Sequence, residues 1–229
     1  GSVAYTSYLH FYSSHSDELY VYNWGEYIDE SVIDEFEKET GIEVVYDMYE
    51  TNEEMFPVIE AGGIAYDAVC PSDFMIQKMR EHDLLAEINF DNVPNLKEID
   101  PLYLELAQSF DPENKYAVPY TWGTIGILYN KERLEELGVE PPTKWSDLWD
   151  ERLKGEILMQ DSVRDKMNFE YITYATPNKG AFDLLDEEIQ NNKAVFPDID
   201  SLKNSEVFQY LGDNVDSIYN DLWKEVKSN

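Results

Sequence analysis

The order of hydrophobic segments in residues 19–82 constrains the fold of this chain more than any other feature. An alternating apolar run, Leu19–Trp24, precedes a helical pattern in which Val32, Ile33 and Phe36 share one face. The same pair of signals then occurs twice more, with short joints between the segments. Strand–helix repeats of this kind favour parallel strands joined by right-handed crossovers. The sequence therefore predicts an α/β fold with a mainly parallel sheet flanked by helices.

Capping residues set the limits of the predicted elements. Asp29 suits the N-cap of the first helix, and Gly41 suits its left-handed exit. Pro57 falls inside the second predicted helix, which Gly62 and Gly63 end. The remaining predicted elements of this region are strands over 42–46 and 66–70 and helices over 52–61 and 74–82.

The second half of the chain repeats the pattern less completely. Thr124–Tyr129 predicts a strand, and the helix that follows it ends at Gly138. Trp145 and Trp149 stand four residues apart in a predicted short helix, a spacing more typical of core packing than of a binding platform. A further strand is predicted from Gly155 onward.

The length of 229 residues fits one large domain or two small lobes. Residues 1–17 show no clear period, so we expect a tail or linker there.

The charge is strongly one-sided. The chain carries 48 acidic and 17 basic residues, a formal net charge of −31. Binding to nucleic acid phosphates is therefore disfavoured, whereas cations are attracted. The simplest interpretation of such charge is solubility, so it does not choose a ligand by itself. The apolar runs are too short and too broken by charge to span a membrane. No secretion signal is recognisable, and Gly1-Ser2 resembles an expression scar, so we expect that a targeting segment was removed.

Cysteine and histidine chemistry is sparse. Cys70 is the single cysteine, so the chain forms no intrachain disulfide and no cysteine metal cluster, and we expect it in the core. The histidines His10, His15 and His82 lack the spacing of a zinc site or a catalytic triad. The sequence predicts no metal site and no cofactor.

Aromatic and acidic residues follow several of the predicted strands. Trp24-Gly25-Glu26-Tyr27 comes after the first strand, and Ser72-Asp73-Phe74 after the third. Carboxyl ends of parallel strands meet at one edge of a sheet, where ligands of such folds bind. Rings and carboxylates suit an organic ammonium, and they also suit a sugar with two catalytic acids. A further aromatic segment, 120–123, precedes the predicted strand Thr124–Tyr129, and a polar segment, 161–165, follows the strand predicted from Gly155.

A family resemblance covers nearly everything after residue 18. The segments that carry it are YNWGEYIDESVIDEFEKETGIEVVYDMYETNEEMF, YDAVCPSDFMIQKM, SFDPENKYAVPYTWGTIGILYN, WSDLWDERLKGEILMQDSVRD, EYITYATPNKGAFDLLDEEIQNN and SIYNDLW. Together they resemble the spermidine/putrescine-binding proteins of bacterial ABC importers. The resemblance implies a type II periplasmic-binding-protein fold with two hinged lobes, without catalysis. It implies an extracytoplasmic protein, either in the periplasm or anchored to the outer face of the cell membrane. It also implies that the protein binds ABC permease subunits.

The resemblance also implies ligand-binding residues. Trp24 matches a ring wall and Glu26 an acid that faces an amine. Phe74 stands where relatives often carry tyrosine, and Ser162 replaces what is an acid in some relatives. The full implied set is Trp24, Glu26, Tyr27, Ser72, Phe74, Trp122, Ser162, Asp165, Phe208 and Gln209.

One departure from the family pattern is large. Only a few residues separate Asp165 from Tyr171, where the family carries most of its second lobe and a return segment. The second lobe is therefore expected to be incomplete, polyamine binding to be impaired, and open edges to allow self-association. The resemblance implies a division into four regions: a tail or linker over 1–17, a first lobe over 18–118, a hinge crossover with the remnant of a second lobe over 119–166, and a C-terminal helical segment over 167–229. Three alternatives stay open at this point: a carboxylate-based glycoside hydrolase, a permease-docking domain that binds no solute, and a related solute-binding protein for another cation.

Overall fold

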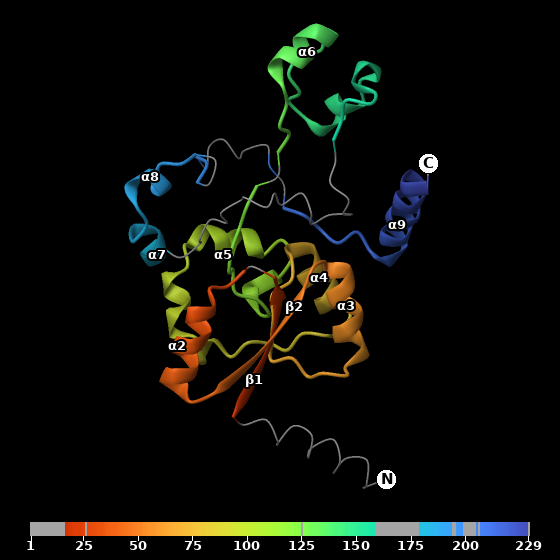
Figure 1. Ribbon diagram of the computed structural model, residues 1–229. Coiled ribbons are helices and arrows are strands. Elements are labelled where there is room, and N and C mark those ends of the chain that lie inside the picture. The colour runs from red at the N-terminus through yellow and green to blue at the C-terminus, as the bar shows by residue number, and fades with distance from the viewer. Residues whose placement is uncertain are drawn as a thin grey trace. The chain divides into compact units, whose positions relative to one another are not determined.

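The computed structural model describes residues 17–25, 27–124, 126–158, 179–193, 196–198, 205 and 207–228 (Figure 1). The chain forms two compact units. Unit 1 comprises residues 1–120 and 206–212, and unit 2 comprises residues 121–205 and 213–229. The four-region division made from the sequence stays a prediction.

A three-stranded parallel sheet lies at the centre of unit 1. Its strands are β1 (Glu18–Trp24), β2 (Glu43–Tyr49) and β3 (Ala68–Val69), in the order β2-β1-β3. The register places Trp24 opposite Tyr49 and Tyr22 opposite Val69. The predicted parallel α/β arrangement is confirmed, although β2 runs three residues further than predicted and β3 is shorter.

Helices cover both faces of this sheet. They are α2 (Glu30–Thr40), α3 (Asn52–Ala61) and α4 (Asp73–Glu81). The chain moves from β1 outward to β2 and then back past β1 to β3. Right-handed crossovers therefore place α2 and α3 on opposite faces, as Figure 1 shows.

The predicted caps of these helices are present. The Asp29 carboxylate accepts a hydrogen bond from the Ser31 N–H at 2.9 Å, and Gly41 ends α2 with φ of 74°. Gly62 ends α3 in the same way, and α3 continues through Pro57. The apolar face predicted for α2 is weakly covered, since Val32 and Phe36 are exposed and no α2 residue is buried.

The hydrophobic core of unit 1 lies on the face covered by α3 and α4. Met55 and Met79 are completely buried there, between the sheet and the two helices. Cys70, predicted as a core residue, is half-buried, and burial raises the pKa of its thiol to about 11. The buried cluster consists of Tyr22, Tyr49, Met55, Phe56, Phe74, Met75, Met79 and Tyr210.

Short helices complete unit 1. The buried carboxylate of Asp111 holds the backbone of the residues that follow the last of these helices. Asp111 has no solvent-exposed surface. Its oxygens accept hydrogen bonds from the backbone N–H groups of Lys115, Tyr116 and Ala117 at 2.9–3.1 Å. The elements of this region are η1 (Phe90–Asn92), η2 (Pro94–Glu98), α5 (Pro101–Ala107) and η3 (Pro112–Asn114).

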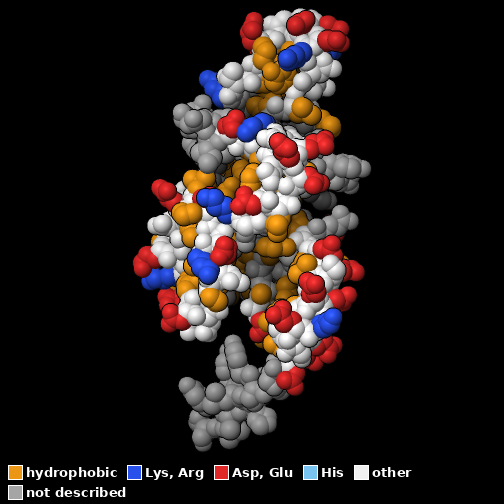
Figure 2. Space-filling view, turned by 90° about the vertical axis from the view of Figure 1, so that its left-hand side faces the viewer, with side chains coloured by type: hydrophobic (Ala, Val, Ile, Leu, Met, Phe, Trp, Pro, Cys, Tyr) orange, Lys and Arg blue, Asp and Glu red, His pale blue; other side chains and the backbone are white. Residues whose placement is uncertain are grey.

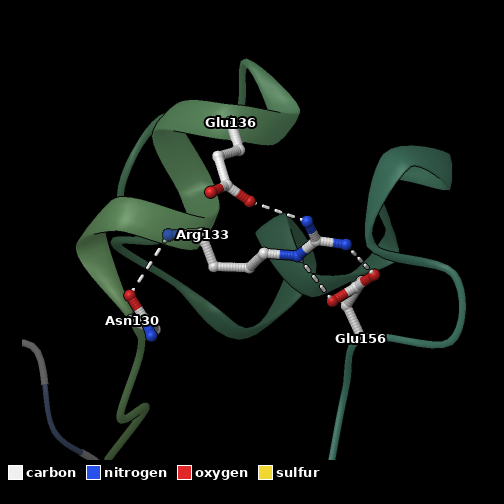
Figure 3. A network of polar contacts seen from close by, with 4 residues as sticks. All are labelled: Asn130, Arg133, Glu136 and Glu156. Atoms are coloured by element: carbon white, nitrogen blue, oxygen red, sulfur yellow. Dashed lines mark hydrogen bonds and ion pairs between the residues drawn. The ribbon is translucent and has the colours of Figure 1, made fainter.

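The described part of unit 2 consists of helices, and the side chain of an arginine connects two of its segments. Arg133 donates from Nε and Nη2 to both carboxylate oxygens of Glu156, at 3.0 and 2.6 Å, and from Nη1 to Glu136 at 2.8 Å (Figure 3). Asn130 caps the helix that carries Arg133, and Gly138 ends it as predicted. The helices are α6 (Lys131–Leu137), η4 (Trp145–Trp149), η5 (Glu151–Leu153), α7 (Lys179–Asp183), α8 (Glu187–Gln190) and α9 (Asp213–Ser228).

Three predictions for unit 2 are wrong. The described part of Thr124–Tyr129 forms no strand, nor do residues 155–158. A strand needs a neighbouring strand for its backbone hydrogen bonds, and the described part of unit 2 has no sheet to supply one. Trp145 and Trp149 are 49% and 83% exposed and not core residues. They lie on a 3₁₀-helix, in which residues three apart, not four, share a face.

No helix in the described ranges is long and apolar enough to cross a membrane. Acidic side chains outnumber basic ones on the face drawn in Figure 2, and hydrophobic side chains are exposed between them.

Candidate functional site

Aromatic rings gather at the carboxyl edge of the sheet in unit 1. Trp24 ends β1 and lies in register with Tyr49, which ends β2. Their ring centroids are 4.7 Å apart, and the Tyr27 ring lies 5.8 Å from Trp24. Tyr49 is buried, whereas Trp24 and Tyr27 are half-buried. We call Trp24, Tyr27 and Tyr49 the ring edge. It offers two accessible rings supported by a buried one.

The loop after β3 reaches the same edge of the sheet. Ser72 is the N-cap of α4, directly after β3. Asn52, completely buried at the start of α3, donates from Nδ2 to the Ser72 hydroxyl at 2.9 Å. The Ser72 N–H donates to Asn52 Oδ1 at 3.3 Å. These two hydrogen bonds connect the loop after β3 to the start of α3, which follows β2.

Tyrosine hydroxyls fix the turns of this edge. The Tyr120 hydroxyl donates to the Tyr27 carbonyl, and the Tyr49 hydroxyl donates to the Cys70 carbonyl. Burial raises the pKa of Tyr120, so its hydroxyl keeps its proton at neutral pH and remains a donor. Tyr120 thereby connects the chain that Asp111 orders with the turn after β1.

Sequence reasoning missed three residues of this site. Tyr49 was missed because the predicted strand stopped at Tyr46, three residues short of the edge. Asn52 was assigned only to a helix, and Tyr120 only to an aromatic segment. β-propensity gave no clear signal for the longer β2, because Tyr49 favours a strand whereas Asp47 disfavours one.

The structure brings some of the predicted site residues together and places others elsewhere. Trp24, Tyr27 and Ser72 come together at the carboxyl edge of the sheet. Phe74 follows Ser72, but its ring is 3% exposed and packs in the core cluster, which leaves little of it for a ligand. Phe208 and Gln209 belong to unit 1 and are exposed. Trp122 is half-buried in unit 2, and Glu26, Ser162 and Asp165 lie outside the described residues.

The chemistry of the ring edge is that of a binding site for an organic cation. Ring faces attract an ammonium group and cover methylenes. In the ranges that the structure describes, no three His, Cys, Asp or Glu side chains form a group that could hold a metal ion.

The comparisons with known proteins identify the family. The family described as bacterial extracellular solute-binding protein matches residues 68–211, more than half of the chain. This chain belongs to that family. Among its relatives is the spermidine/putrescine-binding periplasmic protein of Escherichia coli K12, 37% identical over 157 residues, which are 67% of this chain and 44% of the relative. The putrescine-binding periplasmic protein PotF of the same organism is 38% identical over 141 residues, 61% of this chain and 37% of the relative.

Solved structures agree with this assignment. A structure named as a spermidine/putrescine ABC transporter from Listeria monocytogenes superposes with a TM-score of 0.76 at 30% identity. The substrate-binding protein PotD of a Streptococcus pneumoniae spermidine/putrescine ABC transporter gives 0.69 at 25% identity. Each match covers 93% of this chain and 99% of the solved chain. The predicted periplasmic-binding-protein-like fold and the family resemblance are therefore confirmed.

The extent of the chain differs between these two comparisons. The chain spans less than half the length of the curated relatives it matches. In contrast, neither of the two solved chains has a large segment without a counterpart in this chain. These relatives and solved structures are named as binding or transporter proteins, and none of them is named as a glycoside hydrolase, so that alternative has no support.

Proposed function

We propose that this chain binds a linear polyamine of the spermidine/putrescine class, as the extracytoplasmic solute-binding component of an ABC importer. The observation that carries the proposal is the ring edge at the carboxyl ends of β1 and β2. Membership of the solute-binding family and relatives named for spermidine and putrescine support the choice of ligand.

The ring edge has a definite task in this proposal. Trp24 and Tyr27 face the methylenes and an ammonium group of the polyamine, and each well-placed ring contributes about 0.5–2 kcal/mol. Tyr49 supports Trp24 from the buried side. Glu26, between Trp24 and Tyr27 in the sequence, accepts charge-assisted hydrogen bonds from one ammonium end. Ser72 contributes a hydroxyl, and Trp122, Ser162, Asp165, Phe208 and Gln209 remain proposed contacts.

The affinity of this chain is expected to be low if the internal segment of the family is absent from the protein. A polyamine held by one edge stays half solvated, and exposed ion pairs contribute only about 0–1 kcal/mol each. Calorimetric titration with spermidine and putrescine tests this. Submicromolar binding would contradict the expected weakness while supporting polyamine recognition.

The role of the rings can be tested with a matched pair of tryptophans. Trp24→Ala removes the accessible ring, and we expect the dissociation constant for spermidine to rise about 2- to 30-fold. Trp149→Ala is the control, because Trp149 is 83% exposed on η4 in unit 2. Equal affinity of Trp24→Ala and the unaltered chain would contradict the assigned site.

The role of the acid can be tested in the same way. Glu26→Gln keeps the size of the side chain and removes its charge, so we expect weaker spermidine binding, by about 10-fold or more. Glu140→Gln makes the same charge change at an exposed loop position of unit 2. Similar losses of spermidine affinity in the two variants would mean that net charge alone explains the effect. That result would contradict the role of Glu26.

The transport partners follow from the same proposal. We expect the protein to bind ABC permease subunits. We also expect it to be located at the outer face of the membrane or in a periplasm. Pull-down with the permease, with and without spermidine, separates an importer component from a docking domain that binds no solute. Self-association through open sheet edges stays a prediction that light scattering tests.

A further inference from the structure

A short segment from the end of the chain packs into the core of unit 1. Residues 207–212, which we call the strap, lie in unit 1, while residues 121–205 and 213–229 belong to unit 2. Tyr210 is 7% exposed and joins the core cluster with Met75 and Met79. Its neighbours Phe208 and Gln209 are exposed. The strap is therefore anchored by one residue and presents the preceding two to solvent.

Two consecutive residues of α4 hold this anchor. The Tyr210 N–H donates to Gln77 Oε1 at 3.1 Å. The Lys78 ammonium lies 5.4 Å from the centroid of the Tyr210 ring and 4.5 Å from that of the Phe56 ring. Both distances are within the range of cation–π attraction. Lys78 thus connects α3, through Phe56, with the strap, through Tyr210.

The anchor lies close to the carboxyl edge of the sheet. α4 begins at Asp73, beside Ser72, and Gln77 is four residues further along. At 1.5 Å per residue this is about 6 Å along the helix axis. Residues 208 and 209 directly precede Tyr210, and one or two residues of extended chain can span this distance. They are therefore within reach of the carboxyl edge of the sheet, where the ring edge and Ser72 lie.

We propose that Lys78 is a positioning residue: its ammonium group, shared by the Phe56 and Tyr210 rings, fixes the strap so that Phe208 and Gln209 complete the ligand edge of unit 1. This inference rests on the proposed function and adds to it a residue that does not itself touch the polyamine. The resemblance to the family assigned a role to the strap residues but none to Lys78.

Hydrogen exchange without ligand tests the anchor directly. Lys78→Met keeps an unbranched side chain and removes the charge, and we expect amide exchange across 207–212 to accelerate about 2- to 30-fold. Lys78→Arg keeps a cation over the rings and should restore slow exchange. The control is Lys97→Met, the same charge change at a side chain that is 73% exposed. Equal exchange in Lys78→Met and Lys97→Met would overturn the anchor.

A second variant approaches the contact from the strap. Tyr210→Leu keeps an apolar side chain and removes the ring, so exchange of the strap should accelerate in this variant too. In the double variant, Lys78→Met should add little beyond Tyr210→Leu, because the shared contact is already lost. Full additivity of the two effects would overturn the proposed pairing, and circular dichroism checks that each variant is folded.

Spermidine titration then tests the positioning role. We expect Lys78→Met to weaken spermidine binding by about the same factor by which it accelerates amide exchange of the strap. Lys78→Arg should bind spermidine as the unaltered chain does. A loosened strap with unchanged affinity would overturn the positioning role while leaving the proposed function standing. If the unaltered chain binds no spermidine, both the proposed function and the positioning role are contradicted. The contact between Lys78 and Tyr210 is then tested by the hydrogen exchange result alone.

Discussion

Unit 1 and unit 2 differ in how much their side chains bury, although the same kinds of local signal occur in both. Eight large side chains of unit 1 form one cluster around the sheet. In unit 2 the buried hydrophobic side chains among the described residues are Leu134 and Leu153. Large apolar residues of unit 2 such as Leu128 and Leu158 are 89% and 95% exposed.

The difference shows what capping signals achieve alone. α6 has an asparagine N-cap and a left-handed glycine exit, as well formed as the ends of α2. These signals define a helix locally. They do not supply a partner surface, and most of the stability of helices in proteins comes from packing. We therefore expect unit 1 to dominate the unfolding free energy of the chain.

Removing a core side chain of unit 1 should have the largest effect. Met55 is completely buried, so Met55→Ala should lower the unfolding free energy by about 3 kcal/mol. Leu158→Ala in unit 2 should change it by less than about 0.5 kcal/mol, because that side chain is 95% exposed. Urea unfolding followed by circular dichroism measures both. Equal effects would break the contrast between the units.

The buried carboxylate of Asp111 should rank next. Asp111→Ala leaves three backbone N–H groups without their acceptor, and we expect a loss of about 2 kcal/mol. Asp91→Ala, at an exposed position of η1, is the control and should be close to neutral. A neutral result for Asp111→Ala would mean that water replaces the carboxylate, and that the path to Tyr120 does not depend on it.

The guanidinium contacts of unit 2 should have a smaller, local effect. Arg133→Met removes the contacts to Glu156 and Glu136, all at exposed side chains. We expect amide exchange in α6 to accelerate at most about two- to fivefold, and less in high salt, because exposed ion pairs are weak and screened. Lys131→Met is the control on the same helix. Global unfolding on loss of Arg133 would show that unit 2 has more tertiary order than its burial indicates.

The smallest expected effect is a pH dependence at Asp150. The hydrogen bonds from the Arg152 side chain, and then from its backbone N–H, lower the pKa of Asp150 to about 2. A lowered pKa stabilises the folded form above the ordinary value, here 3.8, and the contribution is lost as pH falls through the folded value. The unaltered chain and Asp150→Asn should differ in their free energy of unfolding, measured by urea unfolding. This difference should shrink as the pH falls from about 4 to about 2. A constant difference over this window would contradict the assigned contact.

Much of unit 1 was predictable because its signals are local. The capping of α2 by Asp29 and Gly41 depends on residues a few positions apart, and so does the amphipathic pattern of the strands. The parallel sheet followed from the order of these elements. The ends of β2 and β3 were not predicted well, since a strand extends as far as its neighbour offers hydrogen bonds, and β3 pairs only at Val21 and Tyr22.

The candidate site was predictable in position and less so in detail. Trp24 and Ser72 were expected at one edge because both follow strands of the same sheet. That Tyr49 supports Trp24, and that Phe74 turns into the core, depends on packing between segments far apart in the chain. The ligand contacts stay a prediction for all of these residues.

The sequence by itself determined the order of the elements, their caps, the single cysteine and the strongly acidic surface, since these depend on composition and on neighbouring residues. Only the tertiary structure decided which rings are open and which are buried, and that Tyr210 returns to α4. The physical reason is that burial is set by the side chains brought together from distant segments, and no local pattern records those partners.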